Sequence, residues 1–435
     1  MKDKIYYGEQ TKAALQNFPF PKHLVHLELI YGIAEVKKAA ALAHKIAGEM
    51  PAEIADAIAT VADEIIAGKH DEQFVTCALQ GGAGTSINMN VNEVIANRAN
   101  ELCKLTVHPN DHVNESQSTN DVNPSAMKIA CIRLTKELLK NLDVLIKSFE
   151  DKARQYRHIM KIGRTHIQDA VPTTFGSEFQ SYADILKQDK KRIEETLPYL
   201  YELNLGGTAI GNSINASEKY ITNAYKELIK ITKLPLKQAD NMMSQTSSSS
   251  DFCHLSAVIT ILFTDISKIA ADIRFLASGP LGGIGEITLK PLQKGSSIMP
   301  GKINPIIPEA MNQMAYEIIG KNITIHQAAQ HSFLELSLMF PILANSLISM
   351  LKLSASGCLV FAESCIQYIE PNTDRAKELL ENSTVYATLF SPHLGYDTVS
   401  LIVKEAVHTH KTFREVVLAK NLMTEKQFEK ISRSN

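Results

Sequence analysis

Residues 295–305, with the sequence GSSIMPGKINP, bring together the side chains best suited to acid–base chemistry in this chain. Serine hydroxyls, a lysine cation and an asparagine amide lie there among glycines and prolines, so the segment can remove a proton and hold a carboxylate. A phosphate-binding loop is excluded, because five residues separate Gly295 from Gly301 where that motif has four, and Ile303 replaces its Ser or Thr. An ordinary surface loop is the remaining alternative.

Three other polar segments separate long apolar stretches and could complete a site. They are residues 84–93 (GTSINMNVNE), 108–121 (HPNDHVNESQSTND) and 163–169 (GRTHIQD). Taken singly, they are typical of a helix start capped by Thr or Ser, an Asx-rich turn and a structural histidine. Several such clusters in one chain are better explained by one shared site.

The composition excludes several classes of function. The chain has 45 basic and 47 acidic side chains, and its net charge of -2 favours neither nucleic acid nor a membrane surface as a partner. We find no apolar run long enough to span a bilayer and no signal segment at Met1. Without an HExxH pattern or a CxxC pair, no metal and no disulfide is expected. The cysteines are expected to be buried, reduced thiols of a cytoplasmic protein: Cys77, Cys103, Cys131, Cys253, Cys358 and Cys365.

Helix signals dominate the elements that must position these residues. Apolar residues recur every three or four positions over long stretches, several of which exceed the ~8–20 residues of ordinary helices and favour a long bundle. The stretches predicted to be helical are 35–67, 125–160, 175–203, 251–278, 305–330 and 333–369.

The chain's 435 residues are enough for two or three domains. Pro371 and Asn372 mark a break, after which we expect three or four short helices and a turn at 391–395. The sequence therefore predicts an all-α protein with three parts: a helical N-terminal domain (1–112), a central long-helix bundle (113–371) and a small helical C-terminal domain (372–435).

The order of the motifs GTSxNMNxNE, SQSTND, GRTHxQDAVP, GGTAIG and GSSIMPGKxNP resembles the fumarase/aspartase superfamily, that is, class II fumarase and aspartate ammonia-lyase. The similarity extends from about residue 6 to residue 425. It implies a homotetramer in which long helices form a central super-bundle and three subunits share each active site. It also implies reversible anti-elimination from a small dicarboxylate, a substituted succinate, to give fumarate, with no metal or organic cofactor.

The resemblance also implies roles for the catalytic side chains. Ser296 is the expected base that removes the Cβ proton, with its alkoxide stabilised by backbone N–H groups and nearby Lys302. His166 faces the leaving group, and Glu309 is expected to orient that histidine.

Further residues are expected to hold the substrate. The extra charge of an aci-carboxylate intermediate would be held by Thr85, Ser118, Thr119 and Ser297. Lys302 and Asn304 would bind the other carboxylate, and Asn120 and Thr165 would face the leaving group with His166. A second, peripheral anion-binding site would use His108, Asn110 and Asp111.

The leaving group is ambiguous in the sequence. The segments 118–121 (STND) and 307–313 (IPEAMNQ) resemble aspartate ammonia-lyases, whereas 206–209 (GGTA) has the fumarase form. Ser247–Ser250 and Phe340 fit neither subgroup. We predict an aspartate ammonia-lyase, with class II fumarate hydratase as the alternative. A non-enzymatic, crystallin-like relative is a third possibility, disfavoured because Ser296, Lys302 and His166 are all present.

Overall fold

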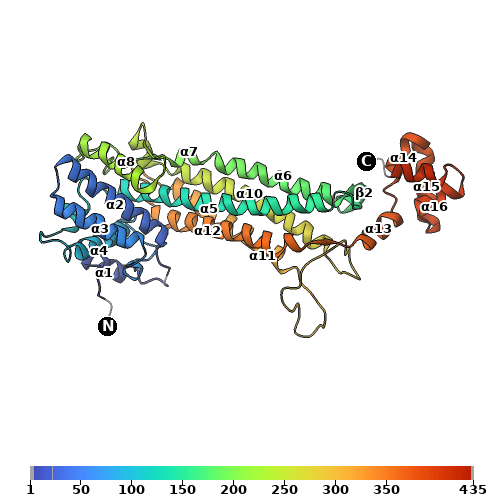
Figure 1. Cartoon of the computed structure of the whole chain (residues 1–435), viewed down its shortest axis with the longest axis horizontal. Coiled ribbons are helices and arrows are strands. Elements are labelled where there is room, and N and C mark those ends of the chain that lie inside the picture. Colours follow the sequence, from blue (N-terminus) through green and yellow to red (C-terminus); the bar gives the residue numbers. More distant parts are fainter. Residues whose placement is uncertain (1–3, 22, 433–435) are drawn as a thin grey trace. The chain divides into compact units, whose positions relative to one another are not determined.

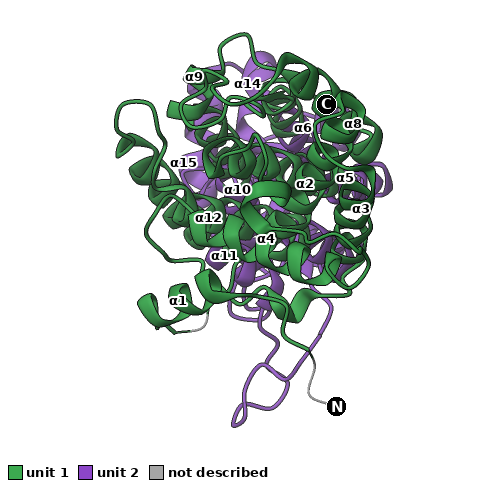
Figure 2. Ribbon diagram, turned by 90° about the vertical axis from the view of Figure 1, so that its left-hand side faces the viewer, with its two compact units in different colours: residues 1–140, 189–263, 314–356 green, residues 141–188, 264–313, 357–435 purple. Residues whose placement is uncertain are grey.

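The computed structural model describes residues 4–21 and 23–432 (Figure 1). Its composition of 65% helix and 6% strand confirms the predicted all-α class. The chain divides into two compact units, each made of three separate stretches (Figure 2). Unit 1 comprises residues 1–140, 189–263 and 314–356, and unit 2 comprises residues 141–188, 264–313 and 357–435. The three predicted domain boundaries remain a prediction.

Unit 1 begins with a cluster of helices in which α2 packs against α3 and α8. The predicted helix at 35–67 is two helices, because Gly48 ends α2 in the left-handed conformation (φ 74°) and Pro51 precedes α3. The helices of this cluster are α1 (Glu9–Asn17), α2 (Leu27–Ala47), α3 (Ala52–Ile66), α4 (Thr85–Ala99) and α8 (Glu218–Thr232). Short helical turns lie at η1 (Asp71–Gln73), η2 (Pro109–Val113), α7 (Leu197–Leu200) and α9 (Met242–Ser247).

Five long helices agree with the predicted stretches, with two departures: α12 begins later than expected because residues 331–339 form a loop, and α6 ends at Glu194 rather than at 203. They are α5 (Thr119–Gln155), α6 (Phe175–Glu194), α10 (Ser250–Leu276), α11 (Ile306–Gln330) and α12 (Phe340–Ser364). Within unit 1, the buried Lys128 of α5 donates to Asp251 of α10 at 2.7 Å. Within unit 2, the rings of Phe149 and Phe361 join α5 to α12 at 6.2 Å. These helices therefore pack on one another in each unit, as a bundle requires.

The strands, which were not expected, form three two-stranded sheets among the described residues. The antiparallel hairpin of β1 (Met160–Thr165) and β2 (Gln168–Thr174) is the longest. The other pairs are parallel β3 (Glu202–Leu203) with β4 (Lys237–Gln238), and antiparallel β5 (Ile287–Thr288) with β6 (Glu370–Pro371).

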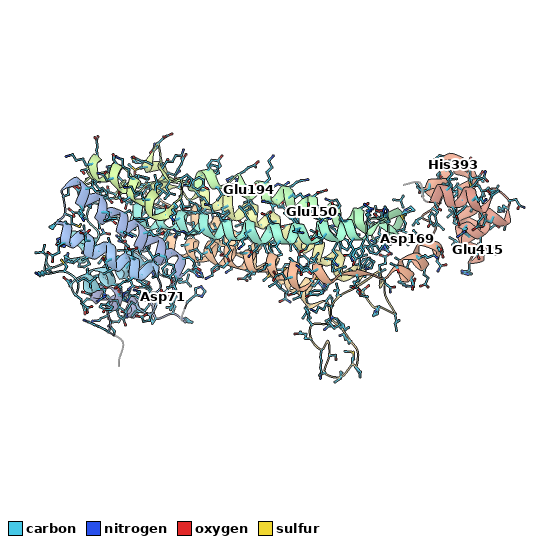
Figure 3. All side chains as sticks on the ribbon, viewed as in Figure 1. Asp71, Glu150, Asp169, Glu194, His393 and Glu415 are labelled. Carbon is cyan, nitrogen blue, oxygen red and sulfur yellow. The ribbon has the colours of Figure 1, made fainter. Side chains whose placement is uncertain are left out.

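The C-terminal part, after the short turn η3 (Ile366–Tyr368), contains five described helices rather than three or four. The predicted turn at 391–395 is instead the end of a helix, which Gly395 terminates at φ 78°. Phe390 stacks on Phe428 at 4.5 Å in the core of this part. Glu415, which is labelled in Figure 3, completes a capping box at the start of α16. The helices are α13 (Thr373–Asn382), α14 (Ala387–Leu394), α15 (Tyr396–Thr409), α16 (Phe413–Ala419) and α17 (Glu425–Ser432).

Two sequence expectations need correction. The stretches Ser250–Leu276 and Phe340–Tyr368 are long and apolar enough to cross a membrane, by length and composition only. The most apolar window of each is 50% and 61% buried within the chain, so packing among long helices accounts for that composition. The cysteines are free thiols, but only three are buried; the other three, Cys77, Cys103 and Cys253, are partly exposed.

Candidate active site

The Ser296 hydroxyl lies in a backbone pocket of its own loop. Its Oγ accepts hydrogen bonds from the backbone N–H groups of Ile298 at 3.2 Å and Met299 at 3.1 Å. Two N–H dipoles aimed at one oxygen favour its anionic form, which a serine needs in order to act as a base. The Lys302 ammonium makes no hydrogen bond or ion pair with the described residues. Of the groups expected to stabilise the Ser296 alkoxide, only the backbone N–H groups contact its oxygen here.

Two hydrogen bonds close the neck of the Ser296 loop. The backbone N–H of Gly295 donates to the Lys302 carbonyl at 3.0 Å, and the Asn304 amide donates to the Gly295 carbonyl at 2.9 Å. A Cβ atom at position 295 would lie 2.3 Å from the Lys302 carbonyl oxygen, so only glycine fits there. Residues 291–303 line an open cavity of about 790 Å³. Asn304, expected to bind a carboxylate, has one amide hydrogen committed to the neck and a second one to offer.

His166 lies at the exposed tip of the β1–β2 hairpin, in the two-residue turn between Thr165 and Gln168. His166 and Ile167 both have positive φ, 56° and 63°. Hairpin turns of this kind normally use Asn and Gly, and a β-branched residue in that conformation is strained. Ile167 is also 69% exposed, so burial of its own side chain does not offset the strain. Strain of this type concentrates at functional sites.

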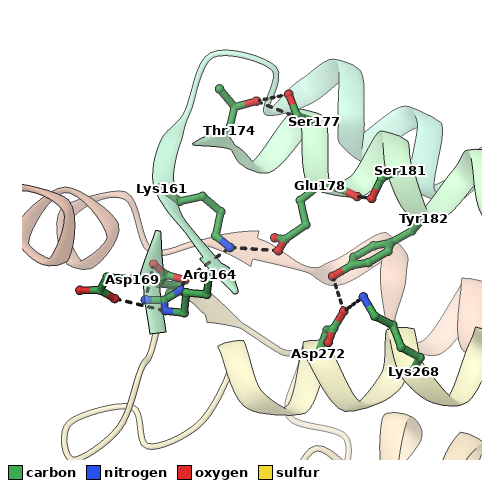
Figure 4. A network of polar contacts seen from close by, with 11 residues as sticks. Lys161, Arg164, Asp169, Thr174, Ser177, Glu178, Ser181, Tyr182, Lys268 and Asp272 are labelled. Carbon is green, nitrogen blue, oxygen red and sulfur yellow. Dashed lines mark hydrogen bonds and ion pairs between the residues drawn. The ribbon is translucent and has the colours of Figure 1, made fainter. Parts of the chain in front are cut away.

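A buried ion-pair network braces the base of this hairpin (Figure 4). The Arg164 guanidinium donates to both oxygens of Glu286, at 2.8 and 3.2 Å, and Glu286 is fully buried. Lys161, also buried, lies 3.0 Å from Glu178 and 3.6 Å from Glu286. Burial raises the pKa of Glu178, and the Lys161 charge opposes that rise. Because β5 follows Glu286 directly, this network fixes the hairpin to the strand that leads into the Ser296 loop.

Glu309 lies exposed in the first turn of α11. Among the described residues of this chain, it makes no hydrogen bond or ion pair with His166. Its expected role in orienting that histidine therefore stays a prediction.

In unit 1, the starts of α4 and α5 lie side by side. The Asn123 amide donates to the Gly84 carbonyl at 3.1 Å, which places Thr85, the first residue of α4, next to α5. The N-cap of α4 is Gly84 at φ 87°, not Thr85 or Ser86 as expected, because the backbone enters this helix through the left-handed region. Thr85 is exposed, and its hydroxyl is not used as a cap.

Ser118, Thr119 and Asn120 open α5 and are half-buried. The Ser118 hydroxyl accepts from the Asn120 N–H at 3.2 Å, and the Asn120 amide donates to the Ala209 carbonyl at 2.8 Å. The segment 206–209 therefore lies against the 118–121 motif, 85 or more residues away in the chain. Asp121 holds these two segments together. No role was predicted for Asp121 from the sequence, although the residue lies inside a recognised motif.

The expected second anion site is a short π-helical turn, η2. His108 caps it, with Nδ1 accepting from the backbone N–H groups of Asn110 at 3.4 Å and Asp111 at 3.1 Å. The Asp111 carboxylate also lies 3.1 Å from that nitrogen. An anion would thus have to compete with a carboxylate, so this role too stays a prediction.

The predicted site residues are divided between the two units. Thr85, Ser118, Thr119 and Asn120 belong to unit 1, together with the η2 turn. Unit 2 holds Thr165, His166, Ser296, Ser297, Lys302, Asn304 and Glu309. The described residues include no group of three or more His, Cys, Asp or Glu side chains arranged to hold a metal ion.

Comparison with known proteins finds family models that match both ends of the chain. Residues 2–320 match a family model described as lyase, and residues 387–434 match one described as fumarase C C-terminus. Aspartate ammonia-lyase from Bacillus subtilis (strain 168) is 42% identical over 98% of this chain and 91% of its own length. Class II fumarate hydratase from Ralstonia nicotianae is 40% identical over 97% of this chain and 93% of its own length.

A solved structure also matches. The crystal structure of a fumarate lyase:delta crystallin from Brucella melitensis, bound to cobalt, superposes with a TM-score of 0.95 at 40% identity. The match covers 99% of this chain and 95% of that one. The predicted fold, with its many long helices, is therefore confirmed along the whole chain.

Proposed function

We propose, from the premise that this chain belongs to the fumarase/aspartase superfamily of lyases, that it removes ammonia from L-aspartate to give fumarate. The observation that carries the chemistry is the Ser296 hydroxyl with two backbone N–H groups aimed at its oxygen. The segments 118–121 and 307–313 support ammonia as the leaving group. The relatives include both aspartate ammonia-lyases and fumarases at similar identity, so the substrate is our inference.

Elimination begins at Ser296. Its alkoxide takes the Cβ proton of L-aspartate, and the electron pair left on that carbon spreads onto the adjacent carboxylate as an aci-carboxylate. The pair then forms the carbon–carbon double bond while the carbon–nitrogen bond breaks, and the ammonium group leaves as neutral ammonia. The hydroxyls of Thr85, Ser118, Thr119 and Ser297 would hold the charge that develops, and Lys302 and Asn304 would hold the other carboxylate.

The leaving-group side of the site would consist of Asn120, Thr165 and His166, with Glu309 behind the histidine. Because the Asn120 amide nitrogen donates to the Ala209 carbonyl, its Oδ1 is left as an acceptor. An ammonium group carries only donors, so an acceptor at this position suits L-aspartate.

We propose that the protein is a cytoplasmic homotetramer with active sites shared by three subunits. In support, α11 has an exposed apolar stripe of Tyr316 (65% exposed), Ile319 (39%) and Ile323 (56%) at helical spacing. Mixing Ser296→Ala with His166→Ala, followed by dissociation and reassembly, should restore activity in hybrid tetramers. Intact hybrids with no activity would contradict shared sites.

One assay tests the substrate. The purified protein is offered L-aspartate and L-malate separately, and fumarate is followed by its ultraviolet absorbance. Turnover of L-aspartate supports the proposal. Turnover of L-malate alone would make the protein a fumarate hydratase, which the 206–209 segment and the Ralstonia relative favour. Activity with neither substrate would favour an unusual amine substrate or a non-enzymatic relative.

A further inference from the structure

We propose that Asp121 is a positioning residue that fixes, through its carboxylate, the two backbone segments 118–120 and 206–209 at the substrate-binding site. The inference rests on the proposed function, because that function places Ser118, Thr119 and Asn120 against the substrate. It holds for either leaving group, since these segments would face a dicarboxylate in both reactions.

The Asp121 carboxylate accepts three backbone hydrogen bonds from two separate segments. Oδ1 accepts from the Ser118 N–H at 2.9 Å, and Oδ2 accepts from the Gly206 and Thr208 N–H groups, each at 3.0 Å. The side chain is fully buried. A carboxylate without access to water has to be stabilised by the protein, and here the backbone of both segments does so.

The 206–209 segment needs this support because its backbone lies in the left-handed region at two positions. Gly206 has φ 85°, and a Cβ atom there would lie 2.7 Å from Ile221. Thr208 also has a positive φ, 60°, which is unusual for a residue with a side chain. Its hydroxyl is buried without a partner. At Thr208 this conformation is strained and persists only where surrounding contacts hold it, and Asp121 binds the N–H groups of both Gly206 and Thr208.

The effect of Asp121 reaches side chains assigned to the substrate. The Asn120 amide donates to Ala209, and the Asn204 amide donates to the Asn120 carbonyl at 3.0 Å. If the 206–209 turn relaxes, the Asn120 side chain and the start of α5 lose their fixed positions. Displacements of about 1 Å at a site of this kind can cost about 10²-fold in rate.

The role requires Asp121 to be ionised, because a protonated carboxyl has one acceptor fewer. Burial raises the pKa of Asp121 to about 6, while its three N–H partners and the Lys37 charge oppose that rise. Lys37, from α2, is fully buried and donates to Asn114 at 2.7 Å, and burial lowers its pKa to about 7. The other titratable groups facing Asp121 are the phenols of Tyr220 and Tyr225, from α8.

A matched pair of variants tests the inference. Asp121→Asn keeps the shape of the side chain but replaces one carboxylate oxygen by an amide NH₂ group. That group cannot accept a hydrogen bond from the backbone N–H that it faces. Glu93→Gln is the control, because Glu93 is also a buried carboxylate that accepts from backbone N–H groups, those of Gly8, Gln10 and Thr11. Both variants should lose stability, whereas only Asp121→Asn should lower kcat/KM, by about 10²-fold.

The measurements are thermal unfolding, oligomeric state, kinetics and the affinity for succinate by calorimetry. The kinetic measurements use the substrate, L-aspartate or L-malate, that the unaltered protein turns over. The two variants can therefore be compared even if the proposed leaving group is wrong. If neither is turned over, succinate affinity is the readout, and it should fall at least tenfold in Asp121→Asn only. Equal losses of kcat/KM, or of succinate affinity, in the two variants would overturn the inference. Unchanged succinate affinity and kcat in Asp121→Asn would overturn it as well.

Should Asp121→Asn fail to fold, Lys37→Met provides a second test. Removing the Lys37 cation should raise the pKa of Asp121, because the nearby positive charge that favours its ionised form is lost. The acid limb of the profile of kcat/KM, or of succinate affinity, should then move to higher pH. A uniform loss at all pH values, or an acid limb that stays in place, would show that Lys37 and Asp121 have a structural role only.

Discussion

The Ser296 loop and the start of α5 carry residues for the same proposed reaction but are built in opposite ways. Around Ser296 the chain is exposed: Ile298 is 83% exposed and Met299 47%. Around Asp121 the chain is buried, and one carboxylate binds three backbone N–H groups. We infer that the region around Asp121 holds the substrate in a fixed position, whereas the exposed Ser296 loop is free to move.

The largest expected effect comes from removing the base. Ser296→Ala should lower kcat by about 10²–10⁴-fold while succinate affinity stays nearly unchanged, because the hydroxyl acts only when the proton moves. Lys302→Ala should weaken succinate affinity as well, since it removes a carboxylate contact present before and during reaction. Steady-state kinetics and calorimetry separate the two variants. Near-normal turnover by Ser296→Ala would mean that another group takes the proton.

Next in size is the ion pair behind the hairpin. Glu286→Gln should lower the free energy of unfolding by about 3–5 kcal/mol, because it leaves the buried Arg164 and Lys161 charges without their shared partner. Asp151→Asn is the control: its carboxylate is 47% exposed, and such pairs contribute about 0–1 kcal/mol. Denaturant unfolding at one protein concentration measures both. Equal losses in the two variants would show that the network does not brace the hairpin.

The smallest effects are expected from replacing one glycine in each of the two regions. Gly206→Ala should lower stability by about 1–3 kcal/mol, because the new methyl group meets Ile221 in a packed region and the residue keeps a positive φ. Gly295→Ala should break the hydrogen-bonded neck and lower kcat, but it should cost less stability than Gly206→Ala, because the neck lies in an exposed loop that can open to make room for the methyl group. Thermal unfolding and kinetics on both proteins check this. Equal stability losses would remove the contrast between the two regions.

Periodicity predicted the long helices well, because apolar residues every three or four positions require one buried face. It failed at local breaks. The hairpin at 160–174 was missed because its turn is His166–Ile167, without the Gly or Asn that marks such turns. The break between α2 and α3 was missed because the helical pattern continues on both sides of Gly48.

The motifs supplied the side chains of the candidate site, but not the groups that hold them. Asp121 lies within a motif, yet two of its three backbone N–H partners are 85 and 87 positions away, which no local pattern reveals. Glu286 is likewise 122 positions from Arg164. The signal available in the sequence was only that Asp121 and Arg164 are charged residues inside polar motifs, which pattern alone does not distinguish from exposed side chains.

The closed neck of the Ser296 loop has a consequence for chain entropy. Because the Gly295 N–H holds the Lys302 carbonyl, residues 296–301 form a hydrogen-bonded ring rather than an open tether. The free energy needed to bring the ends of a flexible segment together is therefore already offset in the resting protein. A substrate that pulls this ring toward the site has only the orientation of the ring to restrict. Closure of the loop can therefore be fast and reversible, even though most of the ring is exposed to water.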